Sequence, residues 1–228
     1  ASGQNTAVTA DQNNLLINSE EAAQRHERAR QRAARIWAAA RPAPPDHRYL
    51  ARKGVQGHGL RVYRGALVAP ARDAAGVLHG LQFIGASGAK RFLKGARVQS
   101  LHCLVGEHGD DVCAEPSAAA SDVVCVVEGF ATGASVHEAT GHAVAVAFHA
   151  GNLAAVARAI RERHPQANVV VCADDDRDTP GNPGLTHARQ AALAVGGLLA
   201  IPDFGPDRPA DASDFNDLHR HRGLSAVL

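Results

Sequence analysis

The chain has 228 residues, enough for one large domain or two small ones with a real hydrophobic core. Hydrophobic residues make up 45% and charged residues 21%, a balance typical of folded globular proteins that excludes wholesale disorder. No apolar run approaches the roughly 18 residues of a membrane span, and a formal net charge of +1 provides no overall basic field for nucleic acid. Any nucleic-acid binding must therefore depend on local basic patches.

The cysteines and the N-terminus indicate a reduced, cytoplasmic protein. The four cysteines form no C-x-x-C pair, and two of them, Cys125 and Cys172, lie in valine-rich runs where a thiol packs as a small apolar group. Residues 1–18 are polar and lack the apolar core of a secretory signal peptide. Because residue 1 is Ala and Met is absent, we expect a partial or processed chain whose remaining domains lie elsewhere.

The N-terminal part predicts a helix followed by short strands. Residues 1–18 show no periodicity and are expected to form a disordered leader. Ser19 is a typical N-cap, and the Ala- and Arg-rich stretch after it predicts a helix over 20–40. A short helix and three strands follow, at 49–50, 60–63, 66–70 and 77–84. We therefore expect residues 19–118 to form an α+β subdomain that is β-rich after its first helix.

From about Ser121 the pattern changes to apolar strands separated by helices. This alternation predicts an α/β domain over 122–228 with a mainly parallel sheet covered by helices on both faces. We place the domain boundary in the small-residue stretch 114–120. The expected elements are strands at 123–127, 143–147, 169–173 and 198–201, and helices at 131–140, 152–164, 185–195 and 211–223.

Acidic residues follow two predicted strands of this domain. Glu128 comes directly after the first strand, and Asp174-Asp175-Asp176 follows the third. Open α/β sheets bind their ligands at the carboxyl ends of the strands. Because alternate residues of an extended segment point the same way, Asp174 and Asp176 can converge on one ion while Asp175 faces elsewhere. Hard oxygen ligands suit Mg²⁺ or Mn²⁺, so the pattern predicts a divalent-cation site with Glu128 across the crevice.

A simpler interpretation is that these carboxylates only solvate the strand ends. Two clusters, each followed by glycine and a helix, favour the ligand interpretation. A calcium-binding EF-hand loop is excluded, because a loop begun at Asp174 has Thr179 and Leu185 where Gly and Glu are required.

These residues resemble the Toprim domain shared by bacterial-type primases, topoisomerases and some nucleases. The likeness consists of Glu128-Gly129 after one strand, Gly151 after a second and the aspartates 174–176 after a third. It covers about residues 122–205.

The upstream segments narrow the resemblance to primases. Residues 67–76 and 90–93 are similar to the segment before Toprim in the catalytic core of bacterial-type DNA primases, a combination that topoisomerases lack. Residues 49–54 and 214–218 have counterparts in primases of plasmids and other mobile elements. The resemblance thus covers most of the chain after Ser19.

The resemblance implies an enzyme, a DNA primase of plasmid or mobile-element replication. Such an enzyme synthesises short RNA primers from ribonucleoside triphosphates on a single-stranded DNA template. In this phosphoryl transfer, metal ions clamp the triphosphate and the attacking hydroxyl. The resemblance assigns Asp174 and Asp176 to Mg²⁺ or Mn²⁺, and Glu128 to metal binding or proton transfer. It also implies a helicase or other replication domain as a partner, and no membrane.

Basic residues complete the implied site. Arg72 and Arg91 match basic positions that line the template and nucleotide cleft of the family, with Lys90 and Lys94 beside them. Such side chains neutralise phosphates without reading the base sequence. The alternative is that Lys90 and Lys94 only protect a strand edge from pairing.

Three departures from the family pattern stand out. Thr132 occupies the position, four residues after the motif Glu, where replicative primases usually carry Asp. The turn at 177–181 is long, and we expect Asp178 to be a helix-start residue rather than a ligand. The zinc-ribbon template reader of replicative primases is absent from the sequence.

Two rival functions stay open. A Toprim endonuclease would use the same acidic residues to hydrolyse phosphodiesters, and the primase-like upstream segment argues against it. A catalytically silent DNA-binding accessory module would keep the fold alone. The retention of Glu128, Asp174 and Asp176 argues against that module, because the fold does not need them.

Overall fold

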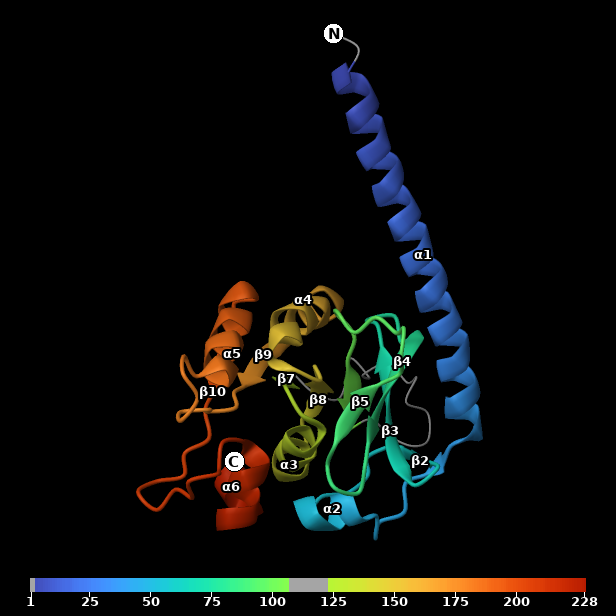
Figure 1. Ribbon diagram of the computed structural model, residues 1–228. Coiled ribbons are helices and arrows are strands. Elements are labelled where there is room, and N and C mark those ends of the chain that lie inside the picture. Colours follow the sequence, from blue (N-terminus) through green and yellow to red (C-terminus); the bar gives the residue numbers. More distant parts are fainter. Residues whose placement is uncertain (1–2, 107–122) are drawn as a thin grey trace.

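The computed structural model describes residues 3–106 and 123–228, which form two sheets that lie side by side with helices around them (Figure 1). Sheet A is antiparallel and comes from the N-terminal part of the chain, whereas sheet B is mainly parallel. The predicted fold class, an α+β region followed by an α/β region with a mainly parallel sheet, is confirmed. The predicted boundary at 114–120 lies outside the described residues.

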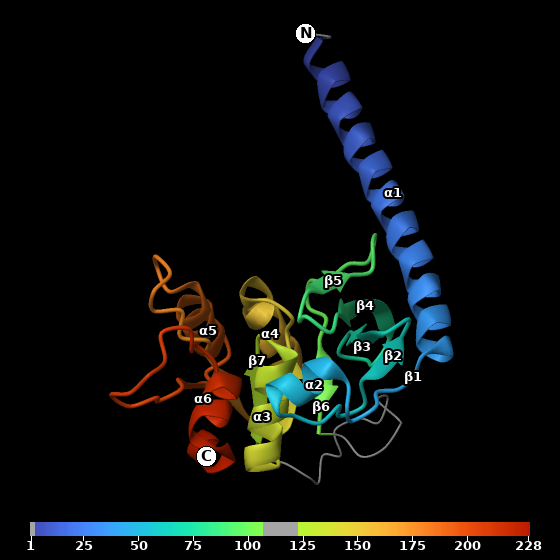
Figure 2. The ribbon, with the colours of Figure 1, turned by 60° about the horizontal axis from the view of Figure 1, so that its bottom comes forward.

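Helix α1 (Gly3–Ala39) begins earlier than the sequence analysis expects. Residues 3–18 of the expected leader and the expected N-cap at Ser19 fall within this helix. No proline and no further glycine follow Gly3 before Ala39, and Ala, Gln and Leu favour helix, so no residue stops it. The N-terminal part of α1 projects away from the sheets (Figures 1 and 2). No helix in the described ranges, α1 included, is both long and apolar enough to cross a membrane.

Sheet A has the strand order β1-β2-β3-β4-β5. Ala33 and Trp37 of α1 pack on it beside Val68, Leu81 and Phe83. Helix α2 (Arg48–Lys53) precedes β2 and ends at Gly54, whose φ of 66° favours glycine. The three expected strands are confirmed to within two residues as β2, β3 and β4. The bounds are β1 (Arg41–Pro42), β2 (Arg61–Tyr63), β3 (Ala66–Arg72), β4 (Leu78–Ile84) and β5 (Lys90–Phe92).

Sheet B has the strand order β10-β9-β7-β8-β6. The three neighbours β9, β7 and β8 are parallel, and β6 pairs antiparallel with β8 at one edge. Strand β6 precedes the predicted domain boundary, so the chain enters sheet B earlier than expected. The bounds are β6 (Cys103–Val105), β7 (Val123–Val127), β8 (Ala143–Val146), β9 (Asn168–Cys172) and β10 (Leu198–Ala200).

Helices cover both faces of sheet B, as its alternating strand residues require. Val124 and Val126 of β7 pack with α4 and α5 on one face. Cys125 and Val127 pack with α3 and α6 on the other. The helices are α3 (Phe130–Thr140), α4 (Leu153–Arg163), α5 (Pro183–Ala194) and α6 (Phe215–Arg222), with 3₁₀ turns at Ala150–Asn152 and Leu224–Val227.

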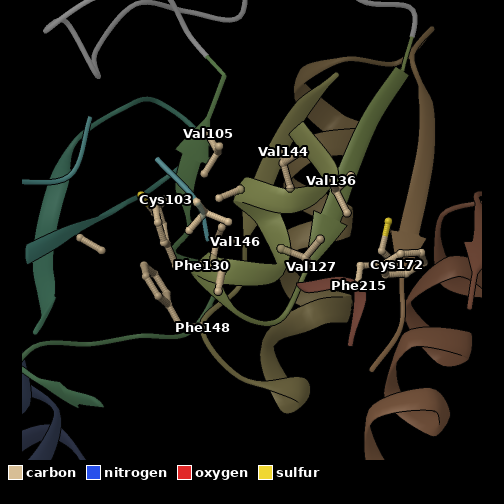
Figure 3. Close-up of a cluster of buried hydrophobic side chains, with 14 of the residues drawn as sticks. Cys103, Val105, Val127, Phe130, Val136, Val144, Val146, Phe148, Cys172 and Phe215 are labelled. Carbon is tan, nitrogen blue, oxygen red and sulfur yellow. The ribbon is translucent and has the colours of Figure 1, made fainter. Parts of the chain in front are cut away.

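One cluster of buried side chains joins the two sheets. It includes Leu67 and Ile84 from sheet A together with Val127 and Val146 from sheet B. Phe130, Val146 and Phe148 lie between the sheets in Figure 3. Phe148 meets Phe92, the last residue of β5, edge to face with ring centroids 5.6 Å apart. This shared core fixes β5 against the carboxyl edge of sheet B.

Candidate active site

The predicted acidic residues meet at the carboxyl edge of sheet B. Glu128 follows β7, and Asp174 and Asp176 follow β9. These strands are parallel neighbours in which Val126 is paired with Val171, so their last residues lie at one edge. The pKa of Asp174 responds to the charges of both Glu128 and Asp176, which places the three carboxylates within electrostatic reach of one another.

Asp174 has the least satisfied carboxylate of this group. Its Oδ1 is enclosed by protein and has no hydrogen-bond partner. Burial raises its pKa well above the usual range, and the neighbouring carboxylates of Asp214, Glu128 and Asp176 raise it further. Burial also raises the pKa of Glu128, although Lys90 and a hydrogen bond from the Ala150 N–H oppose that rise. Negative charge thus exceeds positive charge in the cluster, where Lys90 is the cation that acts on both Glu128 and Asp174.

Asp214 is a fourth carboxylate that the sequence analysis does not assign to the site. It caps α6, and its Oδ1 accepts a hydrogen bond of 2.8 Å from the Asp217 N–H. Its Oδ2 accepts one of 3.1 Å from the hydroxyl of Thr132. Thr132 holds the position where the family pattern expects Asp, so the structure brings a carboxylate to that position from α6. The only sequence signal was the primase-like stretch 214–218.

Asp175 points away from the other carboxylates, as predicted. It forms an ion pair with Arg208 and accepts a 2.7 Å hydrogen bond from the Asn182 amide. Burial acts to raise its pKa, but these two partners hold the pKa below the usual range. The Asp175 N–H donates to the Ser213 carbonyl at 2.7 Å, which joins the loop after β9 to the loop that carries Asp214.

The start of α5 supports Asp176. The Gly184 N–H donates to Oδ2 of Asp176 at 3.1 Å. A Cβ at residue 184 would overlap the Asp174 carbonyl oxygen and lie 2.8 Å from the same Oδ2, so only glycine fits. The N-cap of α5 is Asn182, and exposed Asp178 pairs with Arg177 at 3.5 Å. Asp178 is therefore neither the predicted helix-start residue nor part of the carboxylate group.

The predicted basic residues divide into two groups. Lys90 lies beside the carboxylates, with its Nζ 3.4 Å from the point that a Cβ of Gly129 would occupy. Arg91 and Lys94 are exposed on the same stretch, and the Arg91 guanidinium lies 5.4 Å from the centre of the Phe83 ring. Lys90 is thus the member of this stretch that lies at the carboxylates, whereas Arg91 projects from the other side of β5 and Lys94 lies in the turn after the strand.

Arg72 lies apart from this group. It pairs with Leu78 at one end of β4, whereas Lys90 pairs with Ile84 at the other end. The Arg72 side chain is buried and donates to the Gly76 carbonyl at 2.8 Å. The structure thus does not bring Arg72 to the carboxylates, and its contacts suit a structural role.

The carboxylates suit a divalent cation, although they are not already arranged as a complete cage. Within 3–106 and 123–228, no three His, Cys, Asp or Glu side chains are close enough together to hold a metal ion. The enclosed, unpartnered Oδ1 of Asp174 and the raised pKa values nevertheless indicate a place where a cation would relieve repulsion. The oxygen donors match Mg²⁺, which usually binds few carboxylates and keeps several waters.

Comparison with known proteins agrees with these features. The family model described as "Toprim domain" matches residues 123–225. A DNA primase TraC from Escherichia coli is 38% identical over 208 residues, 86% of this chain and 18% of the relative. A second DNA primase TraC from Escherichia coli is 38% identical over 188 residues, 77% of this chain and 12% of the relative. The chain therefore spans less than a fifth of the length of these relatives.

Two solved structures share the fold. The DnaG primase catalytic domain bound to single-stranded DNA has a TM-score of 0.56 at 16% identity, over 90% of this chain and 78% of that one. Primase domains of bacteriophage T7 gp4, bound to an RNA/DNA hybrid and interacting with the lagging-strand DNA polymerase, give 0.52 at 14% identity, over 78% of this chain and 87% of that one. The resemblance noted in the sequence is confirmed. Residues 123–225 are a Toprim domain, and the chain as described has the fold of a bacterial-type primase catalytic core.

Proposed function

We propose that this chain is the catalytic part of a DNA primase that makes short RNA primers on single-stranded DNA in plasmid or mobile-element replication. The observation that carries the proposal is the enclosed, unpartnered Asp174 carboxylate among Glu128, Asp176 and Asp214, with Lys90 at its side. Two relatives that are 38% identical carry the name DNA primase, which supports the same function.

Each group of residues has a role in this proposal. Asp174 and Asp176 would hold Mg²⁺ or Mn²⁺, with Glu128 and Asp214 adding negative charge around them. When bound, the metal would polarise the triphosphate and lower the charge barrier to attack by the primer hydroxyl. Lys90 lies where it can bind nucleotide phosphates, and exposed Arg91 and Lys94 can bind template phosphates without reading the base sequence.

Glu128 is the candidate for proton transfer. Burial raises the pKa of this carboxyl, and the nearby carboxylate of Asp176 adds to the rise. A carboxyl with a raised pKa accepts a proton more readily at neutral pH, as removal of the proton from an attacking hydroxyl requires. The Ala150 N–H binds the same carboxylate and orients it.

Partners belong to the proposal as well. The chain spans 18% and 12% of the two relatives, and the proposal includes a helicase or other replication domain as a partner. In the bacteriophage T7 structure, primase domains contact a DNA polymerase and an RNA/DNA hybrid, so contact with a nucleic-acid duplex is part of the same proposal.

The test is primer synthesis from labelled ribonucleotides on mixed-sequence single-stranded DNA with Mg²⁺ or Mn²⁺. The parent should make short RNA products, and Glu128→Gln should reduce them by about 100-fold or more. Asp178→Asn is the matched control, because it removes an exposed carboxylate outside the cluster and should keep full activity. Metal-dependent nicking of DNA without products would favour the endonuclease, and neither activity would favour the silent module.

A further inference from the structure

A basic groove lies between α1 and the turn after β5, outside the carboxylate group. It encloses about 440 Å³. Arg25, Arg28 and Arg32 line it from α1, and Lys94 lines it from the turn. Glu21 is the acidic member of its lining, and the other lining residues are Gln24, Ala29 and Gly95.

The cations of this groove are free to bind a ligand. Arg25, Arg28 and Arg32 are exposed and, at spacings of three and four residues, share one face of the helix. Across the described residues, none of the three forms an ion pair or a side-chain hydrogen bond, and neither does Lys94. Arg30, by contrast, is paired with Glu27 at 2.7 Å on another side of the helix. Because the whole chain has a net charge of +1, this concentration of positive charge is local.

Close packing fixes the two walls relative to each other. Gly95 has φ 86°, and a Cβ there would lie 3.2 Å from Cγ of Arg25 and 3.8 Å from Cβ of Ala29. Ala29 is itself buried beneath the turn. The position of α1 relative to the turn after β5 is therefore fixed by packing at Gly95 and Ala29.

The groove continues the basic stretch that begins at the carboxylates. Lys94 follows Lys90 by four residues, at most about 14 Å of extended chain. Lys90 lies against Gly129, beside Glu128, and exposed Arg91 lies between the two lysines. Cations thus lie beside the carboxylate group, on β5, in the turn after β5 and on α1.

We propose that this groove binds the sugar–phosphate backbone of single-stranded DNA where the strand leaves the catalytic carboxylates. This inference deepens the proposed function and rests on it, because it identifies the strand as the template. Arginine binds phosphate oxygens through paired N–H donors, and the groove lining offers no aromatic platform for stacking bases. The lining also lacks the large apolar side chains with which a helix enters a lipid surface, so nucleic acid fits better than a membrane.

Salt-dependent binding of fluorescent single-stranded DNA tests the proposal. The variant Arg25→Gln/Arg28→Gln/Arg32→Gln should bind a long strand ten- to a hundredfold more weakly at about 0.1 M salt. The slope of log affinity against log salt should shrink by about 2, since each lost phosphate contact on a single strand removes about 0.7. A strand too short to reach from Lys90 to α1 should lose little affinity.

The control is Arg158→Gln/Arg189→Gln/Arg220→Gln, which removes three exposed arginines from α4, α5 and α6. It has the same change in charge and should keep the parental slope. Unchanged Trp37 fluorescence shows that the groove variant is folded. An unchanged slope in the folded groove variant overturns the inference, as does a variant that loses only its binding to anionic phosphatidylserine vesicles.

These measurements need neither metal nor nucleotides, so they separate this inference from the proposed function. A smaller salt slope in the groove variant, together with a parent that makes no primers, would reject primer synthesis and still support DNA binding by the groove. Primer synthesis by the parent, together with an unchanged slope in the groove variant, would support the primase and reject DNA binding by the groove.

Discussion

At the scale of single residues, Asp174 is the carboxylate that the protein itself stabilises least. Its Oδ1 has no hydrogen-bond donor, and burial and three neighbouring carboxylates raise its pKa. A carboxylate accepting two or three N–H bonds would show the opposite shift. Asp175, one residue further, shows that opposite shift because Arg208 and Asn182 bind it. Asp174 is thus suited to bind a ligand, whereas Asp175 stabilises the fold through Arg208 and Asn182.

The variant Asp174→Asn should stabilise the protein in the absence of metal and abolish metal-induced stabilisation. The folded-state pKa of Asp174 lies above its unfolded value of about 3.9, so its contribution is fully present below that pH and is lost as the pH rises through the folded pKa. The variant should therefore gain most over the parent at neutral pH and nothing at low pH. Urea unfolding at several pH values, with and without Mn²⁺, measures both effects.

Asp178→Asn is the control for this prediction, because Asp178 is exposed and lies in the same loop. It should leave both the pH profile and the Mn²⁺ effect as in the parent. If Asp174→Asn instead lowered the free energy of unfolding at neutral pH, the carboxylate would have a structural partner, and its assignment to a ligand would be wrong.

Sequence reasoning located the carboxylates that follow strands and missed the one that does not. Glu128, Asp174 and Asp176 could be predicted because apolar strands and the carboxyl-edge rule fix their position. Asp214 lies in a polar segment, and only the packing of α6 on α3 brings it to Thr132. The predicted grouping of Arg72 with Lys90 differs from the structure. Only the register of β3 with β4 shows that the two residues lie at opposite ends of β4.

At the scale of elements, the start of α5 fixes the distance between β9 and the helix that follows it. Gly184 is buried, and its N–H binds Asp176 while its Cα faces the Asp174 carbonyl. Helix propensity alone favours alanine over glycine within a helix by roughly 0.5–1 kcal/mol. The close approach of the Asp174 backbone therefore requires glycine at residue 184, although helix propensity favours alanine there.

The variant Gly184→Ala should lower the free energy of unfolding by about 1–3 kcal/mol, because the added methyl group overlaps the Asp174 backbone. Because the methyl group also displaces the carboxylate of Asp176, the variant should bind Mn²⁺ at least tenfold more weakly, as measured by calorimetric titration. Gly85→Ala is the control, since the nearest atom to its added methyl would be 3.7 Å away. A Gly184→Ala protein with increased stability would show that helix propensity dominates and that the contact is loose.

Element boundaries were the part that the sequence predicted least well. Helix α1 extends to Gly3 because local propensity continues through the polar segment that the sequence analysis interpreted as a leader. Strand β6 was not predicted, because its pairing with β8 is a long-range contact that no local pattern around Cys103 reveals. Strands β7, β8 and β9 were predicted correctly because they are apolar throughout and bounded by glycine or charge.

At the scale of the whole molecule, three buried clusters connect α1 to the far helices of sheet B. Trp37 lies in the cluster between α1 and sheet A, and Ile160 lies in the cluster between sheet B and α4. The central cluster, with Ile84 on one side and Val127 on the other, contacts both sheets. A core that continues through both sheets predicts cooperative unfolding, because neither sheet can expose its central face alone.

The variant Ile160→Val tests this cooperativity. It removes one buried methylene group and should lower the free energy of unfolding by about 0.5–1.5 kcal/mol. Trp37 is the only tryptophan, so its fluorescence reports on the α1 region while circular dichroism reports on all helices. Both probes should shift by the same amount in urea. Leu193→Ala is the control, because this side chain is 78% exposed, and it should leave the urea transition of both probes unchanged. An unmoved Trp37 transition would mean that the two sheets unfold separately, and that β5 is not rigidly fixed at the carboxylate edge.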